Sequence, residues 1–174
     1  PNMPFFPSLP DDAGIGHLFN IKPGHRDGFG KFSDAVMRDD SVFSIAEREL
    51  IAAFTSALNS CDYCYGGHSA IARQYGVAEG VFESLIDDID MAPVNDKLKP
   101  ILRFVRKLTL EPFKIVQADA DAVYAAGWDE EGLADAIWIS ARFSMMNRLS
   151  LGHGLNADSA TFEARAKAMD YGKN

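Results

Sequence analysis

Cysteine is scarce in this sequence of 174 residues, which contains only Cys61 and Cys64. A disulfide between residues so close in the chain closes too short a loop to stabilise a fold, so a disulfide-stapled scaffold is excluded. In a reducing compartment, such a pair is typical of a catalytic or metal-binding site. We therefore assign the two cysteines to chemistry rather than to architecture.

Positive charge is also in short supply, because 17 lysines and arginines stand against 25 aspartates and glutamates and give a formal net charge of −8. Nucleic acids and anionic membrane surfaces bind clustered cations, so we predict neither as a partner. The sequence has no apolar run of bilayer length and no basic, apolar leader at its N-terminus. We therefore expect a soluble, cytoplasmic protein.

A strand pattern is missing as well, because apolar and polar residues do not alternate for long in any segment. Helical spacing is frequent instead, as in Leu98, Ile101, Leu102, Val105 and Leu108. We predict an all-α fold, a compact single-domain helical bundle of about seven to nine helices over residues 1–174. Four of the eight prolines lie in residues 1–10, which predicts an extended N-terminal arm over residues 1–12.

Start and stop signals divide the chain into helices. The expected helices are residues 23–38, 44–58, 61–75, 78–88, 95–110, 117–126, 129–151 and 159–171, with a turn or short helix before residue 19. Ser44-Ile45-Ala46-Glu47 is a capping box. Ser60, Asn95 and Asp129 are expected N-caps, and Gly76 and Gly127 end two of the helices.

The most informative segment is Cys61-Asp62-Tyr63-Cys64-Tyr65-Gly66-Gly67-His68. In a helix, about 100° per residue places Cys61, Cys64 and His68 within a sector of roughly 60°. The two cysteine Cα atoms would then lie about 5 Å apart, within the range that a disulfide tolerates. A dithiol that can close reversibly beside a base is suited to redox chemistry.

Redox chemistry of this kind needs a thiolate, whereas an ordinary thiol with a pKa near 8.5 is only about 3% ionised at pH 7. The first turn of a helix favours negative charge, and His68 can accept the proton of Cys64. If segments 44–58 and 61–75 form a hairpin, Glu49 and His68 meet within about 3 Å along the helix axis. We predict the order Glu49, His68, Cys64, with Asp62 projecting away toward solvent.

The same residues allow two other interpretations. Cys61, Cys64, His68, Ile71 and Tyr75 share one helical face, which is also the pattern of an inert core stripe. Cysteine, histidine and glutamate side chains also bind zinc, but ligands at i, i+3 and i+7 on one helix make poor tetrahedral geometry. We predict neither a metal nor a cofactor.

The spacing Glu49-x11-Cys61-x2-Cys64-x3-His68 resembles the active-site signature of the alkylhydroperoxidase D (AhpD-like) branch of the carboxymuconolactone decarboxylase superfamily. The flanking segments 47–51 and 59–64, together with Asn147-Arg148, are most similar to its peroxidase-related subgroup. The resemblance implies an all-helical homo-oligomer, a dimer, trimer or hexamer, with peroxidase activity. It also implies a hydroperoxide substrate and a thiol or dithiol reductant.

By this resemblance, Cys64 is the peroxidatic cysteine, Cys61 is the resolving cysteine, and His68 and Glu49 belong to the proton relay. In the best-understood members a second histidine immediately precedes the peroxidatic cysteine, and Tyr63 takes that place here. A phenol with a pKa near 10 is a poor base at neutral pH. The superfamily's other branch lacks the cysteine pair and implies the alternative of a decarboxylase or lactone-type reaction.

Overall fold

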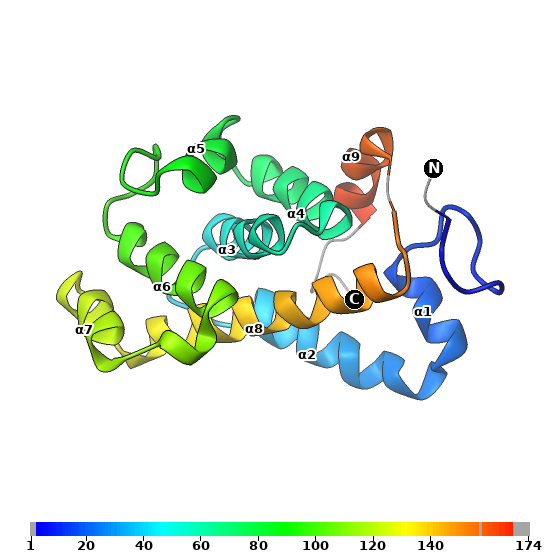
Figure 1. Cartoon of the computed structure of the whole chain (residues 1–174), viewed down its shortest axis with the longest axis horizontal. Coiled ribbons are helices and arrows are strands. Elements are labelled where there is room, and N and C mark those ends of the chain that lie inside the picture. Colours follow the sequence, from blue (N-terminus) through cyan, green and yellow to red (C-terminus); the bar gives the residue numbers. More distant parts are fainter. Residues whose placement is uncertain (1–2, 157, 169–174) are drawn as a thin grey trace.

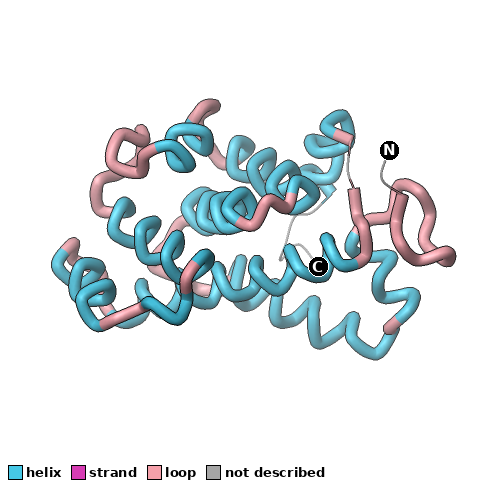
Figure 2. The backbone as a smooth tube through the Cα atoms, in the orientation of Figure 1, coloured by secondary structure: helices cyan, strands magenta, loops and turns pink. Residues whose placement is uncertain are grey.

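Helices make up all the regular structure of the computed structural model, which describes residues 3–156 and 158–168. Within these residues there is no strand, so the all-α prediction is confirmed (Figures 1 and 2). The α-helices are α1 (Ile15–Ile21), α2 (Arg26–Arg38), α3 (Ile45–Leu58), α4 (Asp62–Gln74), α5 (Val81–Asp87), α6 (Leu98–Leu110), α7 (Gln117–Ala125), α8 (Glu130–Gly152) and α9 (Ser159–Ala168). Two short 3₁₀ turns, η1 (Pro23–His25) and η2 (Pro112–Lys114), precede α2 and α7.

Helix α3 lies at the centre of the bundle, and every residue from Arg48 to Ser56 is buried. A helix buried on all sides needs neighbours on all sides. Helices α2, α4, α5, α6 and α8 supply them, with α4 forming an antiparallel hairpin with α3 (Figure 1). The predicted hairpin of residues 44–58 and 61–75 is therefore confirmed.

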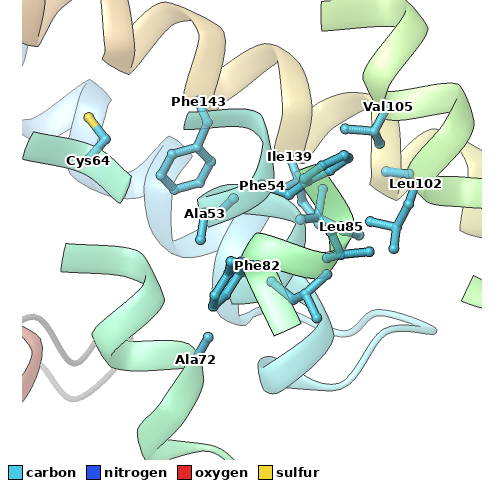
Figure 3. Close-up of a cluster of buried hydrophobic side chains, with 14 of the residues drawn as sticks. Ala53, Phe54, Cys64, Ala72, Phe82, Leu85, Leu102, Val105, Ile139 and Phe143 are labelled. Atoms are coloured by element: carbon cyan, nitrogen blue, oxygen red, sulfur yellow. The ribbon is translucent and has the colours of Figure 1, made fainter. Parts of the chain in front are cut away.

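The hydrophobic core fills the space between α3, α5, α6 and α8. Figure 3 shows Phe54, Leu85, Leu102 and Ile139 within this cluster, and Cys64 at its edge. The segment with both cysteines thus lies where the core meets the helix hairpin. None of the described helices has both the length and the apolar character needed to cross a bilayer.

Several helix boundaries agree with their predicted caps. At Ser44 both halves of the capping box form, because the Ser44 amide donates to Glu47 Oε2 (2.8 Å) and the Glu47 amide donates to Ser44 Oγ (3.2 Å). Asp129 Oδ1 accepts from the Gly132 amide at 2.9 Å and caps α8. Gly76, with φ of 101°, follows the last turn of α4 as expected.

Three predicted helix starts are wrong. Ser60 does not cap α4: it adopts a left-handed turn with φ of 53°, and Cys61 is the N-cap. Asn95 Oδ1 accepts from the Lys97 amide in a turn, so α6 begins only at Leu98. The segment from residue 78 becomes helical only at Val81, after Gly80. Asn and Ser favour turns as well as caps, which explains the first two errors. Residue 171, the predicted end of the last helix, lies outside the described residues.

The N-terminal segment before α1 has no regular helix or strand in its described part. The Phe5 amide donates to the His153 carbonyl at 3.1 Å, and the Phe6 ring stacks on the His153 ring with centroids 4.6 Å apart. The segment is thereby attached to the C-terminal end of α8. His153 itself is the C-cap of that helix.

Helix α9 packs across the dithiol helix α4 at Gly66. A Cβ atom added to Gly66 would lie 2.1 Å from the Phe162 ring, a distance at which atoms overlap. Phe162 and Ala166 also form a small buried cluster with Ala70 and Ile71. The glycine therefore permits a close approach that covers α4 with α9.

Candidate active site

The two cysteines stand at the start of α4, Cys61 as N-cap and Cys64 in the first turn. Both are free thiols, with 0% of Cys61 and 5% of Cys64 exposed. The turn at Ser60 brings the Cys61 amide to the Ser56 carbonyl at 3.0 Å, which fixes the approach of the chain to α4. The two side chains are close enough to interact, and this interaction is the largest influence on the pKa of each thiol.

The surroundings of the two thiols make them electrostatically unequal. The hydrogen bond from Cys61 is the largest influence on Cys64 and, with the Ser150 hydroxyl, the charge of His68 and Asn147, lowers the pKa of Cys64 to about 6 against the opposing effect of burial. The Cys64 sulfur lies 3.3 Å from Ser150 Oγ. The same hydrogen bond, followed by burial, raises the pKa of Cys61 well above its usual range. The surroundings therefore favour a thiolate at Cys64 and a protonated thiol at Cys61.

Glu49 and His68 meet across the α3–α4 hairpin, as predicted. Glu49 Oε2 lies 2.7 Å from His68 Nδ1, and Glu49 is fully buried. Burial alone would raise the pKa of Glu49, but His68 and Arg38 outweigh it and lower the pKa, so the side chain is a carboxylate. A carboxylate only accepts hydrogen bonds, so Nδ1 of His68 carries the proton of this contact.

Arg38, at the end of α2, is a member of the site that sequence reasoning missed. Its Nη2 donates to Glu49 Oε1 at 2.8 Å, in an ion pair with 7% of the arginine side chain exposed. Both carboxylate oxygens of Glu49 are therefore engaged, one by Arg38 and one by His68. In the sequence Arg38 looks like an ordinary basic residue in the last turn of a helix, so no local pattern identifies it.

Two polar residues of α8 complete the surroundings of the thiols. Asn147 Nδ2 donates to Ser56 Oγ at 3.0 Å, and Asn147 Oδ1 accepts from Asn59 Nδ2 at 2.9 Å. Ser150 lies one turn further along the same face of the helix. The resemblance included Asn147, but Ser150 was missed. Its sequence signal is a polar residue in line with the buried positions Phe143 and Asn147 of α8.

Tyr63, in the place of a second relay histidine, has a structural connection. Its hydroxyl accepts a hydrogen bond from the Ile15 amide at 2.9 Å, at the start of α1. Burial raises the pKa of Tyr63, so the phenol stays neutral. The side chain therefore holds α1 against α4 and does not act as a base. Asp62 is exposed, as predicted.

A cavity of about 240 Å³ opens on the site. Its wall includes Cys64, His68 and Tyr63, together with apolar residues such as Phe143 and Met146, but not Cys61. Four residues of this helical face are buried, and Cys61 and Cys64 belong to the core cluster, but Cys64 and His68 also line the cavity and Tyr75 is 42% exposed. Cys64 is thus the thiol that a small molecule can reach.

The arrangement of these side chains also bears on whether they could bind zinc together. Among the described residues, no group of three or more His, Cys, Asp or Glu side chains surrounds a common point that could hold a metal ion. The Glu49 carboxylate is directed to His68 and Arg38 rather than to the thiols.

Comparison with known proteins connects the chain to one family. Residues 23–92, which include Glu49, Cys61, Cys64 and His68, match the carboxymuconolactone decarboxylase family. YdfG, an uncharacterized protein of Bacillus subtilis (strain 168), is 29% identical over 112 residues, which cover 64% of this chain and 76% of YdfG.

Two crystal structures are similar to the fold. One, described as an alkylhydroperoxidase AhpD core, is of an uncharacterized peroxidase-related protein from Ralstonia eutropha JMP134. It has a TM-score of 0.76 and 27% identity, and the match covers 86% of this chain and 78% of that one. The other is an uncharacterized peroxidase-related protein from Silicibacter sp. TM1040, with a TM-score of 0.73, 24% identity and 92% of both chains covered. At that identity the second likeness concerns the fold alone.

Proposed function

Because the chain belongs to the AhpD-like branch of the carboxymuconolactone decarboxylase superfamily, we propose that it is a thiol-dependent hydroperoxide reductase. The observation that carries this proposal is the asymmetry of the dithiol. Cys64 has the lowered pKa and lines the cavity, whereas Cys61 has the raised pKa and lies behind it. A thiolate with access to a small molecule and a protonated thiol beside it are the two groups that such a reductase needs.

In the first step the Cys64 thiolate attacks the terminal oxygen of the hydroperoxide. An S–O bond forms as the O–O bond breaks, and two electrons pass from sulfur to oxygen. The alkoxide that leaves takes up the proton that Cys64 had lost, delivered from Nε2 of His68, and departs as the alcohol. Glu49 holds the His68 ring through Nδ1, which gives Nε2 a fixed orientation for the proton transfer to the alkoxide.

In the second step the Cys61 sulfur attacks the Cys64 sulfenic acid. The S–O bond breaks, a disulfide forms, and the hydroxyl group leaves as water with the proton of Cys61. An external thiol or dithiol then supplies two electrons and two protons and restores both thiols. The proximity of the two side chains at the start of α4 supports this step, because the Cys61 sulfur has only a short way to move.

The test is a pair of single substitutions that differ only in which sulfur is lost. With cumene hydroperoxide as oxidant and dithiothreitol as reductant, we expect Cys64→Ser to abolish turnover. Without dithiothreitol, Cys61→Ser should keep one rapid turnover and accumulate a sulfenic acid detectable by dimedone labelling and mass. Wild-type peroxide consumption by Cys64→Ser contradicts the proposal.

A carbon–carbon lyase is the second candidate, because residues 23–92 match a family described by a decarboxylase. A decarboxylase does not need the thiols. Alkylation of both cysteines should therefore abolish peroxide reduction but leave a decarboxylase active, which separates the two functions.

We also propose that the protein forms a homo-oligomer, since α8 exposes Trp138 (58%), Met145 (39%) and Leu149 (36%) in one stripe.

A further inference from the structure

The active-site cavity holds more positive charge than the dithiol chemistry requires. Arg142 from α8 and Arg165 from α9 line its wall, and Asp34 from α2 is a carboxylate of the same wall. The two guanidinium groups share this wall with the Asp34 carboxylate, the Cys64 thiolate and otherwise apolar residues. A low dielectric constant strengthens electrostatic interactions, so a charged ligand in the cavity interacts strongly with the guanidinium groups.

Arg165 is held with its guanidinium directed at this space. The group lies 3.7 Å from the centroid of the Tyr63 ring, next to Cys64 in the chain. Its Nη2 lies 3.9 Å from the position that a Cβ would take on Gly67, so the guanidinium packs directly against α4. The ring fixes one face of the planar guanidinium and leaves its edge for hydrogen bonding.

The hydrogen-bonding capacity of Arg165 is only partly used. Its Nη1 is buried and makes no hydrogen bond within the part of the chain that the structure describes. None of the ion pairs found among the same residues includes Arg165. A buried cationic donor without an acceptor is unfavourable, and an anionic ligand would remove the penalty.

Arg142 and the outer side of Arg165 add to this pattern. Arg142 is 3% exposed, donates to Ser33 Oγ at 2.9 Å and lies 4.6 Å from the Phe143 ring centroid, so its charge is fixed in the wall. Arg165 also lines a groove on the far side of Tyr63, together with Arg26. Positive charge thus continues from the outer groove into the cavity, as is expected of a path for an anion.

We propose that the substrate is a small hydroperoxide that carries a carboxylate, and that Arg165 binds this carboxylate. The inference rests on the proposed function and names the substrate class of the same site. A cavity of about 240 Å³ is smaller than the roughly 300–1,000 Å³ typical of sites for drug-sized ligands, so the body of the substrate is small. The apolar wall receives that body, and the guanidinium fork orients the peroxide toward Cys64.

The test uses matched substrates that differ only in charge: cumene hydroperoxide with a para carboxylate, and the methyl ester of the same compound. For the wild type we expect kcat/KM to favour the acid by roughly tenfold to a hundredfold, as for a charged hydrogen bond. Arg165→Gln should bring the ratio of acid to ester close to one, and Arg165→Lys should restore part of it. Lys167→Gln removes an exposed charge from the same helix and should leave the ratio unchanged.

A second readout does not depend on turnover. The corresponding alcohol, with carboxylate or ester, is used as a non-reacting ligand, and its binding is measured by calorimetry. Tight binding of the carboxylate that is lost in Arg165→Gln but not in Lys167→Gln supports the anion site even if no hydroperoxide is reduced, an outcome in which only the proposed function fails. Equal turnover and equal binding of acid and ester by the wild type overturn the inference and leave the reductase intact. Loss of acid and ester activity to the same extent in a folded Arg165→Gln variant also overturns it.

Discussion

Replacement of Glu49 by glutamine is the perturbation for which the structure gives the most definite expectation. The substitution keeps the size and the hydrogen-bonding reach of the side chain but removes its charge. Glu49 is fully buried, with Arg38 at 2.8 Å from one oxygen and His68 at 2.7 Å from the other. The variant therefore retains a buried guanidinium without its counter-charge.

The expected loss of stability follows from the burial of the Glu49–Arg38 ion pair. Loss of one partner of a buried ion pair destabilises a protein by about 3–5 kcal/mol, because the other charge remains buried. For a chain of this length that corresponds to a fall in Tm of roughly 6–20 °C. Glu47→Gln, on the same helix, is the matched control: glutamine also serves in a capping box, so its change should stay within about 0.5 kcal/mol.

The loss of stability in Glu49→Gln should also depend on pH in a characteristic way. Because the pKa of Glu49 is lowered in the folded protein from its ordinary value of 4.5, the carboxylate stabilises the fold fully above pH 4.5, and this contribution is lost as the pH falls through the folded value. The difference in unfolding free energy between the wild type and Glu49→Gln should therefore shrink below pH 4.5.

The assay is urea unfolding followed by circular dichroism at a series of pH values, with peroxide reduction measured on the same samples. We expect Glu49→Gln also to slow peroxide reduction at neutral pH, since His68 loses the group that orients Nδ1. A change in unfolding free energy no larger than that of Glu47→Gln, at every pH, refutes the argument that Glu49 is a buried counter-ion.

Three further predictions test the surroundings of the site. Ser150→Ala removes a hydroxyl 3.3 Å from the Cys64 sulfur and should raise the pKa of Cys64 by about one unit, measured by the absorbance of the thiolate at 240 nm. An unchanged titration contradicts this role. Gly66→Ala places a Cβ against Phe162 and should destabilise the protein by about 1–3 kcal/mol. Phe162→Ala in the same chain should recover part of this loss. If the two changes in unfolding free energy, measured by denaturant unfolding, simply add, the clash is ruled out. Tyr63→Phe leaves the Ile15 amide without its acceptor and should lower stability by about 1 kcal/mol, whereas equal stability means that this hydrogen bond contributes nothing.

The hairpin and its Glu49–His68 contact could be predicted from the sequence because their signals are local. The capping box at Ser44 fixes the start of α3, and helical rise alone then sets Glu49 and His68 at one height. The cysteine spacing fixes which sulfurs meet in the same way. These elements need no knowledge of any packing beyond two neighbouring helices.

The rest of the site depends on contacts between distant segments. Ser150 reaches Cys64 across 86 residues, and Asn147 reaches Ser56 across 91, so no local pattern specifies either contact. Ser60 shows that residue type alone does not decide a helix start. Serine suits an N-cap, but the turn from α3 to α4 requires a φ of 53° at Ser60, so Cys61 is the N-cap instead. Long-range packing, not residue preference, decides such positions.

The pH dependence of alkylation at each cysteine tests the central claim most directly. The reduced protein is treated with iodoacetamide between pH 4 and 10, and the modification of Cys61 and Cys64 is followed separately by peptide mass. The account predicts that Cys64 reacts first, with an apparent pKa near 6, while Cys61 stays protonated and unmodified across that range. Equal reaction of the two thiols with a pKa between 8 and 9, or earlier reaction of Cys61, contradicts it.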